Sequence, residues 1–590
     1  MPPPPSAASR DEPHIRESVV GAFAVPETAA GPVVAGSAAE AALPEGVVAD
    51  PGVQGIAADP GVQGIAADPG VRSAVAEPAV REPVAAGSAA PGPGRTERVV
   101  RERGDACPGA LRLHAADDGF LARVRIPAGL LDARQARLLA LAADRFGDGR
   151  LDLTSRGNVQ LRGLADGCGS ELAALLDGAG LLPAPGHERV RNIVATPLSA
   201  PGDRLRPAVR PWALELDRLL CANARVTALS GRFLFAFDDG RGDVAALGPD
   251  VTVLGRPGRR ALVRLGPAAD AVEVAGTDAP RAALLAAEYF LDAADAAGTR
   301  AWRVRELPAE HALDAGEFAG RLAAAGMAAE RVAEVAWPYA APPLPGFAGA
   351  GAGAGAGEGV GAGADAGTGV ASGSAGAGGP LCVLVPLGRL TSGQLRALAD
   401  AAVRRGSAEL LMTPWRSVVL HAGPGSGRES GPASAPAFAT GSGPGSGRGP
   451  ASGSGPRPGR PGDDAAVADG LARAGLVVAA GSAWQSVTAC TGQPGCAKSL
   501  ADVRADAAAV AEAARGPLPV HWSGCERRCG HPQGTAWVDV VATAAGYALS
   551  VHGRERPAVG RDGLAAALAD ARHTDDFRSS AESESDAVQK

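Results

Sequence analysis

PAGLLDARQARLLALAADRFGDGRLDLTSRGNVQLR, residues 127–162, recurs as PLGRLTSGQLRALADAAVRRGSAELLMTPWRSVVLH, residues 386–421, and this repetition decides the fold. The two stretches align without a gap, and hydrophobic periodicity alone would not repeat their polar matches. The coinciding pairs are Pro127 and Pro386, Gly129 and Gly388, Leu131 and Leu390, Gln135 and Gln394, Arg137 and Arg396, Leu139 and Leu398, Thr154 and Thr413, Val159 and Val418, and Leu161 and Leu420. We infer an internal duplication of a strand–helix–strand half-domain. Each copy is too small to be stable alone, so the two are expected to pack together.

The first copy and the residues before it alternate between strand and helix patterns. Phe120–Ile126 is expected to be a strand. Asp132–Phe146 has helical spacing of Leu138, Leu139 and Leu141, with Asp132 as the N-cap. Leu151–Arg162 is expected to return as extended chain.

Long segments of the 590 residues have a composition that cannot form a core. Many of the 82 glycines and 48 prolines are concentrated in runs that are poor in aromatic residues. We expect a disordered N-terminal arm at 1–100, a Gly/Ala linker at 346–380, a Gly/Ser/Pro linker at 423–462 and a tail at 576–590. The ordered remainder reads as alternating strands and helices.

The overall charge excludes some partners. A net charge of -7, from 57 basic and 64 acidic residues, argues against a general nucleic-acid binder. No apolar stretch approaches the ~20 residues of a membrane helix. The first residues lack the pattern of a secretory signal. We therefore expect a cytoplasmic protein with no membrane partner.

Four of the eight cysteines form two close pairs. Cys490 and Cys496 lie in TACTGQPGCAKSL, and Cys525 and Cys529 lie in HWSGCERRCGHP. A disulfide is disfavoured in a cytosolic chain, and structural zinc usually has cysteines two to four residues apart together with an obvious second pair. Four thiolates suit a [4Fe–4S] cluster. The other cysteines are expected to be small buried hydrophobes.

The chain between the pairs explains how they could meet. Trp484–Ala489 and Leu518–Trp522 are expected to be strands, and Leu500–Arg515 a helix between them. A right-handed βαβ unit makes the strands parallel, so both cysteine loops emerge at the same sheet edge. The N-terminus of the helix, near Ala497, is expected to face the anionic centre.

These cysteine motifs resemble the cluster motif of the nitrite and sulfite reductase superfamily, which also has a duplicated ferredoxin-like half-domain. Within it, four segments most resemble the precorrin-3B synthases of aerobic cobalamin biosynthesis. They are CPGALRLH at 107–114, LTSRGNVQLRG at 153–163, ACTGQPGCAKSLADVR at 489–504 and SGCERRCGHP at 523–532.

The resemblance implies an α+β fold with two ferredoxin-like half-domains and two reductase-type α/β modules. The expected boundaries are 101–185 for the first half-domain, 186–345 for a first module without a cluster, 381–422 for the second half-domain and 463–575 for the second module with the [4Fe–4S] site. In the first module, Ala195-Thr196-Pro197 replaces the segment that contains Cys490.

The resemblance also implies a monooxygenase that uses O2 to hydroxylate precorrin-3A at its C20 meso carbon and closes a lactone. The cluster would pass electrons, and an additional mononuclear non-haem iron would activate oxygen. The sequence assigns no catalytic residue and no iron ligands, although His114, His187, His521 and His531 lie near the motifs. No flavin- or nicotinamide-binding pattern is visible, so a separate reductase or ferredoxin is the expected electron donor.

Two alternatives remain open. A sirohaem-dependent sulfite or nitrite reductase would share the fold, and Cys529 would then bridge the cluster to the sirohaem iron. A non-enzymatic iron–sulfur electron carrier would hold a cluster but bind no tetrapyrrole.

Arginines at strand spacing provide candidate contacts to a tetrapyrrole polycarboxylate. Residues two apart on a strand share a face, and guanidinium groups suit carboxylates. A solvated strand face is the competing explanation. The predicted substrate-binding residues are Arg123, Arg125, Arg156, Asn158, Arg162, Arg191, Asn192 and Arg232.

Some positions depart from the family pattern. Trp415 and Ser417 stand in the second copy where the first has an arginine and an asparagine, so only the first copy is expected to keep a charged face. Arg232 and Leu234 stand where sulfite reductases have two lysines, which argues against sulfite as substrate. Arg528 precedes the last cysteine, where a small residue is usual. A bulky side chain beside a proposed cluster ligand is not expected to fit the usual geometry of that loop.

Overall fold

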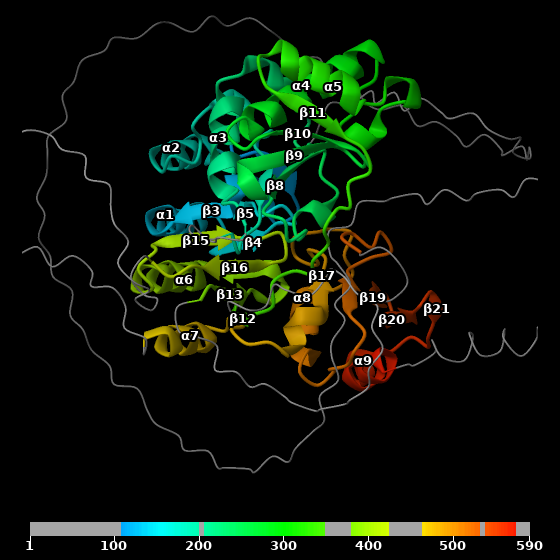
Figure 1. Cartoon of the computed structure of the whole chain (residues 1–590). Coiled ribbons are helices and arrows are strands. Elements are labelled where there is room, and N and C mark those ends of the chain that lie inside the picture. The colour runs from blue at the N-terminus through cyan, green and yellow to red at the C-terminus, as the bar shows by residue number, and fades with distance from the viewer. Residues whose placement is uncertain (1–107, 200–205, 349–378, 424–462, 532–536, 574–590) are drawn as a thin grey trace, which may run out of the picture. The chain divides into compact units, whose positions relative to one another are not determined.

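The computed structural model describes residues 108–199, 206–348, 379–423, 463–531 and 537–573. The arm predicted at 1–100, the tail predicted at 576–590 and nearly all of both predicted linkers lie outside the described residues. The described part contains four β-sheets and nine α-helices (Figure 1), which confirms the α+β class. None of its helices has the length and apolar character needed to cross a membrane.

The two copies of the repeat exchange their shortest strands. One sheet has the order β1-β2-β5-β4-β14 and the other β12-β13-β16-β15-β3. Leu390 of β14 pairs with Leu151 of β4, and Leu131 of β3 pairs with Leu410 of β15. The strands are β1 (His114–Ala116), β2 (Gly119–Val124), β3 (Leu130–Asp132), β4 (Arg150–Leu153), β5 (Val159–Leu164), β12 (Gly346–Phe347), β13 (Leu381–Leu384), β14 (Arg389–Thr391), β15 (Glu409–Met412) and β16 (Ser417–Leu420). Because each sheet is completed by the other copy, the expected packing of the copies is confirmed.

The repeated glutamine has a structural role in both copies. Helix α1 (Ala133–Phe146) has a capping box between Asp132 and Gln135, and α6 (Ser392–Arg404) has one between Thr391 and Gln394. Each glutamine side chain also donates to a carbonyl just beyond another helix: α2 (Gly169–Gly178) in the first copy and α7 (Asp463–Arg473) in the second. The predicted N-cap at Asp132 is confirmed.

The buried face of α1 differs from the predicted leucine stripe. Leu139 is fully buried, but Leu141 is 43% exposed. The buried positions include Ala136, Ala140 and Ala143, where α1 packs against α6 in one core. Small side chains fill this face because the two helices contact each other closely.

Two predicted strands are shorter than expected. The strand predicted at 120–126 ends at Val124, and a turn of 3-10 helix follows at Pro127–Gly129. The extended segment predicted at 151–162 is divided into β4 and β5 by a tight turn, in which Gly157 has a φ of 67°. The predicted linker at 346–380 also begins late, since β12 pairs with β13.

Two further sheets share one topology. In each, the first three strands along the chain are parallel and the following strands are antiparallel. The first comprises β6 (Ile193–Ala195), β7 (Phe235–Asp238), β8 (Val251–Arg256), β9 (Arg260–Leu265), β10 (Ala271–Ala275) and β11 (Ala329–Val332), with helices α3 (Arg210–Cys221), α4 (Ala279–Ala296) and α5 (Ala315–Ala324). The second comprises β17 (Val487–Ala489), β18 (Val520–Ser523), β19 (Val538–Thr543), β20 (Gly546–Val551) and β21 (Arg554–Glu555), with α8 (Val503–Val510) and α9 (Leu564–Arg572).

The predicted βαβ unit around the cysteines is present, but its helix begins late. Strands β17 and β18 are parallel and α8 connects them. The expected helix start near Ala497 is wrong, because α8 begins at Val503 and the Asp502 side chain accepts from the Ala505 N–H. A carboxylate already caps this helix, so its N-terminus is not open to an anionic centre.

Replacing Gly129 with alanine should disrupt the strand exchange. Gly129 has a φ of 68°, and a Cβ there would lie 2.0 Å from the Met412 carbonyl oxygen of the other copy. We expect Gly129→Ala to reduce the free energy of unfolding by roughly 3 kcal/mol or more, measured by urea denaturation.

Gly167→Ala is the matched control. Gly167 has a φ of 82°, but an added Cβ would have nothing within 4 Å of it, so the substitution should cost only the backbone strain of about 1 kcal/mol. Equal losses in the two variants would contradict the importance of the exchanged strand.

Candidate functional site

A cavity of about 620 Å³ lies where both copies of the repeat approach the cysteine loops. Its wall includes the turn between β4 and β5, the corresponding turn between β15 and β16, and the ends of both reductase-like sheets. Lining residues that the argument uses are Arg123, Asp152, Arg156, Leu234, Arg303, Arg305, Trp415, Arg416, Cys490, Arg504, Cys529 and His531.

The cavity wall is strongly cationic. Six of its lining residues are arginines and one, Asp152, is acidic. Arg303 is neutralised by a buried ion pair with Asp250, at 2.6 Å. The remaining arginines outnumber the single carboxylate, which favours a ligand carrying several negative charges.

Two of the predicted substrate-binding arginines line this cavity. Arg123 on β2 donates to the Gln160 side chain on β5 at 3.0 Å. Arg156 lies in the turn before β5 and donates to the Gly231 carbonyl at 3.2 Å. These bonds fix both guanidinium groups at the wall.

Three other predicted arginines do not line this cavity. Arg162 makes a two-bond ion pair with Asp118, and Arg191 makes one with Asp217. Arg125 donates to the Arg189 carbonyl at 3.2 Å. Arg125 and Arg191 instead border a smaller cavity of about 250 Å³.

The remaining predicted residues support the cavity wall rather than form it. Asn158 is buried, accepts from the Ile126 N–H and donates to Asn192 at 3.0 Å. Asn192 in turn donates to the Gly231 carbonyl, which Arg156 also contacts. The Arg232 guanidinium stacks on the Trp302 ring, 4.7 Å from its centroid.

Arg416 is a cavity residue that the sequence pattern did not single out. Trp415 and Arg416 both line the cavity, so the second copy also contributes a charge, from the turn and not from the strand face that the prediction concerned. This charge is Arg416, which stands between Trp415 and Ser417. It therefore does not belong to the set of alternate residues that share one face of the strand. The repeat aligns Arg416 with Gly157. An arginine in place of a glycine was the feature of the sequence that could have identified Arg416 as a functional residue.

The four paired cysteines gather beside the cavity. Cys490 follows β17 and Cys525 follows β18, and the Gly524 N–H donates to the Cys490 Sγ at 3.2 Å. The pKa of the Cys529 thiol is raised, first by burial and then by the charges of Cys490, Cys525 and Cys496. The Cys529 thiol therefore lies within electrostatic range of the other three cysteines.

These residues supply the number of thiolate donors that a [4Fe–4S] cluster needs. Within the described ranges, no three histidine, cysteine or acidic side chains are arranged to hold one metal ion. A four-iron cluster needs four thiolates around a larger centre. Bound iron would offset the mutual repulsion of four thiolates with its positive charge, and its binding would displace their protons.

The second cysteine loop accommodates its unusual arginine. Arg528 has a φ of 46°, in the left-handed region that favours glycine, which explains why a small residue is usual before the last cysteine. Its side chain is 49% exposed, and its guanidinium Nη1 lies 3.8 Å from the Asp539 carboxylate.

Two of the candidate histidines meet beside this loop. The rings of His521 and His531 are 5.4 Å apart between centroids, and His531 contacts Asp539 at 2.6 Å. Burial, then the charges of His531 and Arg416, lower the pKa of His521 to about 3, so its ring is neutral. His114 is exposed and His187 contacts the Asn223 carbonyl, so neither joins this pair.

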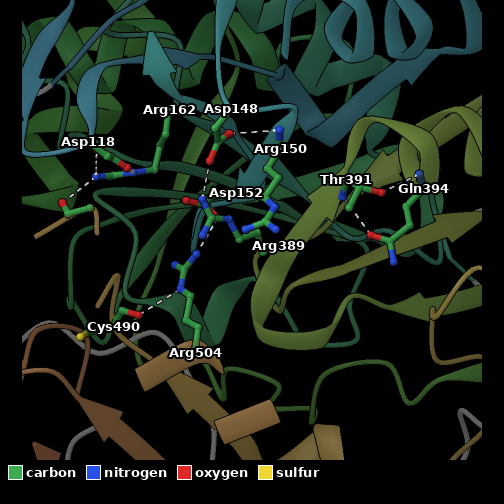
Figure 2. A network of polar contacts seen from close by, with 11 residues as sticks. Asp118, Asp148, Arg150, Asp152, Arg162, Arg389, Thr391, Gln394, Cys490 and Arg504 are labelled. Atoms are coloured by element: carbon green, nitrogen blue, oxygen red, sulfur yellow. Dashed lines mark hydrogen bonds and ion pairs between the residues drawn. The ribbon is translucent and has the colours of Figure 1, made fainter. Parts of the chain in front are cut away.

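The first half-domain holds the first cysteine loop in place. Arg504 donates to the Cys490 carbonyl at 3.1 Å and to Asp152 of β4 at 2.9 Å (Figure 2). Arg389 of the other copy lies 3.5 Å from the same Asp152. Arg162 adds a bond to the Gly495 carbonyl at 2.8 Å. The polar contacts of Asp152 therefore connect both copies to the cysteine loop.

Comparison with known proteins agrees with this architecture. The family model of the nitrite/sulfite reductase ferredoxin-like half domain matches residues 113–177 and 380–424, which contain both copies of the repeat. These two regions of the chain are therefore ferredoxin-like half domains of the nitrite/sulfite reductase type.

Individual relatives include two kinds of enzyme. Precorrin-3B synthase of Sinorhizobium sp is 33% identical over 26% of this chain and 32% of that protein. Ferredoxin–nitrite reductase of Synechococcus elongatus is 34% identical over 21% of this chain and 25% of that protein. The matched region is thus at most about a third of these relatives' length. The solved NirA protein of Mycobacterium tuberculosis is similar over 76% of this chain and 79% of that chain, with 16% identity and a TM-score of 0.48.

Neutralising Asp152 should loosen the cysteine loop. We expect Asp152→Asn to lower the free energy of unfolding by roughly 2–4 kcal/mol, because several buried guanidinium groups lose their counter-charge. Urea denaturation of the full chain measures the change.

Asp400→Asn is the control, since it removes an ion pair with Arg137 whose partners are 52% and 45% exposed. Such an exposed pair contributes less than ~1 kcal/mol. A loss at Asp152 no larger than that at Asp400 would contradict the assigned role.

Proposed function

We propose that this protein is a monooxygenase of the precorrin-3B synthase type, which hydroxylates precorrin-3A with O2 and closes a lactone on the product. The observation that carries the proposal is the arginine-lined cavity, which receives residues from both copies and borders Cys490 and Cys529. A tetrapyrrole with several peripheral carboxylates matches the charge of this wall.

The size of the cavity also supports a large ligand. Its volume of about 620 Å³ falls in the range of roughly 300–1,000 Å³ that is common for small-molecule sites. Trp415 and Leu234 contribute apolar surface to the same wall. A ring with an apolar face and carboxylate edges would use both kinds of surface.

The wall is less suited to a small oxyanion. Leu234 lines the cavity at one of the two positions where sulfite reductases have lysines. Arg232, at the other, is stacked on Trp302 and does not line the cavity. Neither position places a cation at the wall.

Cys490, Cys496, Cys525 and Cys529 are the proposed ligands of a [4Fe–4S] cluster. When bound, such a cluster supplies one-electron transfer. The Gly524 N–H stabilises negative charge on the Cys490 sulfur, and Arg504 fixes the backbone of the same residue.

The proposed reaction needs an external electron donor. One oxygen atom of O2 enters the ring as a hydroxyl group, and the other leaves as water after accepting two electrons and two protons. We propose a separate reductase or ferredoxin as the donor. Among the described residues, no three histidine, cysteine or acidic side chains are grouped to hold the additional mononuclear iron that the resemblance implies.

A sirohaem-dependent nitrite or sulfite reductase is the second candidate. It is favoured by the nitrite reductase relative, whose identity of 34% is close to the 33% of the precorrin-3B synthase. A strong Soret absorption band of the purified protein, together with turnover of nitrite or sulfite, would support this alternative.

Incubation with precorrin-3A tests the main proposal. Anaerobically reconstituted protein, given precorrin-3A, a reductant and then O2, should yield a product heavier by one oxygen atom, detected by mass spectrometry. The mass should increase by two units more with ¹⁸O2. An unchanged product mass would rule the proposal out.

Replacing one proposed ligand tests the cluster. Cys490→Ser should lose most of the acid-labile sulfide and the electron paramagnetic resonance signal of the reduced cluster after anaerobic reconstitution. Cys168→Ala should keep both, because Cys168 lies at the start of α2 outside the cavity lining. Full cluster content in Cys490→Ser would exclude Cys490 as a ligand.

A further inference from the structure

Arg416 adopts a backbone conformation that suits glycine. It lies in the turn between β15 and β16 with a φ of 58°, and the matching residue of the first copy, Gly157, has a φ of 67°. Both turns border the same cavity through their neighbouring residues. A side chain in this conformation is strained, so Arg416 occupies its position against a local preference for glycine.

The fold leaves room for the Arg416 side chain. Its stem passes over Gly388, where an added Cβ would lie 2.9 Å from the Arg416 Cγ. Gly388 is itself a repeated glycine, with a φ of 72°. The stem is thus packed, and Arg416 lines the cavity.

The Arg416 guanidinium is not paired with a carboxylate among the described residues. Among the described residues, the Arg416 side chain forms no hydrogen bond or ion pair. Asp152, the acidic residue of the wall, already bonds to Arg504 at 2.9 Å and lies 3.5 Å from Arg389. Burial, and then the charge of Arg504, lower the pKa of Arg416 to about 10. It is still protonated at neutral pH, as a half-buried cation beside another cation.

We propose that Arg416 binds a peripheral carboxylate of the tetrapyrrole substrate. The inference rests on the proposed function and names a specificity-determining residue of the same site. A carboxylate would supply the missing counter-charge through two parallel N–H···O bonds. Arg416 would then hold the ligand from the second copy while Arg123 and Arg156 hold it from the first.

Binding and stability should respond in opposite ways to Arg416→Gly. Glycine removes the strained side chain, as the first copy already does at Gly157, so the thermal midpoint should be unchanged or higher. Loss of a charge-assisted pair should weaken binding roughly 10- to 100-fold. A purely structural arginine would produce the opposite pattern.

The test uses the full chain and uroporphyrin, a tetrapyrrole octacarboxylate, with binding followed by fluorescence quenching. Arg416→Lys should bind with intermediate affinity, because it keeps the charge but not the paired donors. Arg259→Gly is the matched control: Arg259 also has a positive φ, of 59°, but is exposed and lies outside the cavity lining. Its affinity should equal that of the unmodified protein, and the deficit of Arg416→Gly should shrink at high salt.

The outcomes separate the inference from the proposed function. If the unmodified protein and Arg416→Gly bind uroporphyrin equally, or if Arg259→Gly loses as much affinity, the role of Arg416 is overturned while the proposed function stands. If the unmodified protein does not bind uroporphyrin, the role of Arg416 is overturned, and the incubation with precorrin-3A decides the proposed function separately. If Arg416→Gly is less stable as well as weaker in binding, and Arg416→Lys restores stability and affinity together, Arg416 is structural.

Discussion

The exchange of β3 and β14 between the two copies is the constraint on which the rest of the structure depends. Each sheet has one edge strand from the other copy, so neither copy can be complete without its partner. The exchange also places equivalent turns, before β5 and before β16, on one cavity. A symmetric scaffold therefore presents two different sets of side chains to a single ligand site.

Electrostatics joins this scaffold to the cysteine loops. Asp152 on β4 contacts Arg504 of the second reductase-like unit and lies near Arg389 of the second copy (Figure 2). The arginine excess at the cavity wall is local, since the chain as a whole carries a net charge of -7. Such a concentrated positive field on an acidic protein favours one polyanionic ligand over general anion binding.

Local chemistry explains which structural features were predictable. The capping boxes at Asp132 and Thr391 and the βαβ unit around the cysteines depend on neighbouring residues, and the repeat was visible in its matching glutamines. Helix and strand ends were less predictable. Helix α8 begins at Val503, later than predicted, because Asp502 caps it and the apolar spacing does not indicate this cap.

The sequence by itself determined the duplication, the α+β class and the four cysteines that approach one another, since these follow from spacing and residue type. Only the tertiary structure decided which arginines face the cavity. Arg162 and Arg191 share the strand and motif pattern of the others, but Asp118 and Asp217 take up their donors. Arg416 faces the cavity from a turn without such a partner among the described residues. The physical reason is that a guanidinium group's role depends on whether a carboxylate distant in sequence lies within reach, and folding alone brings those groups together.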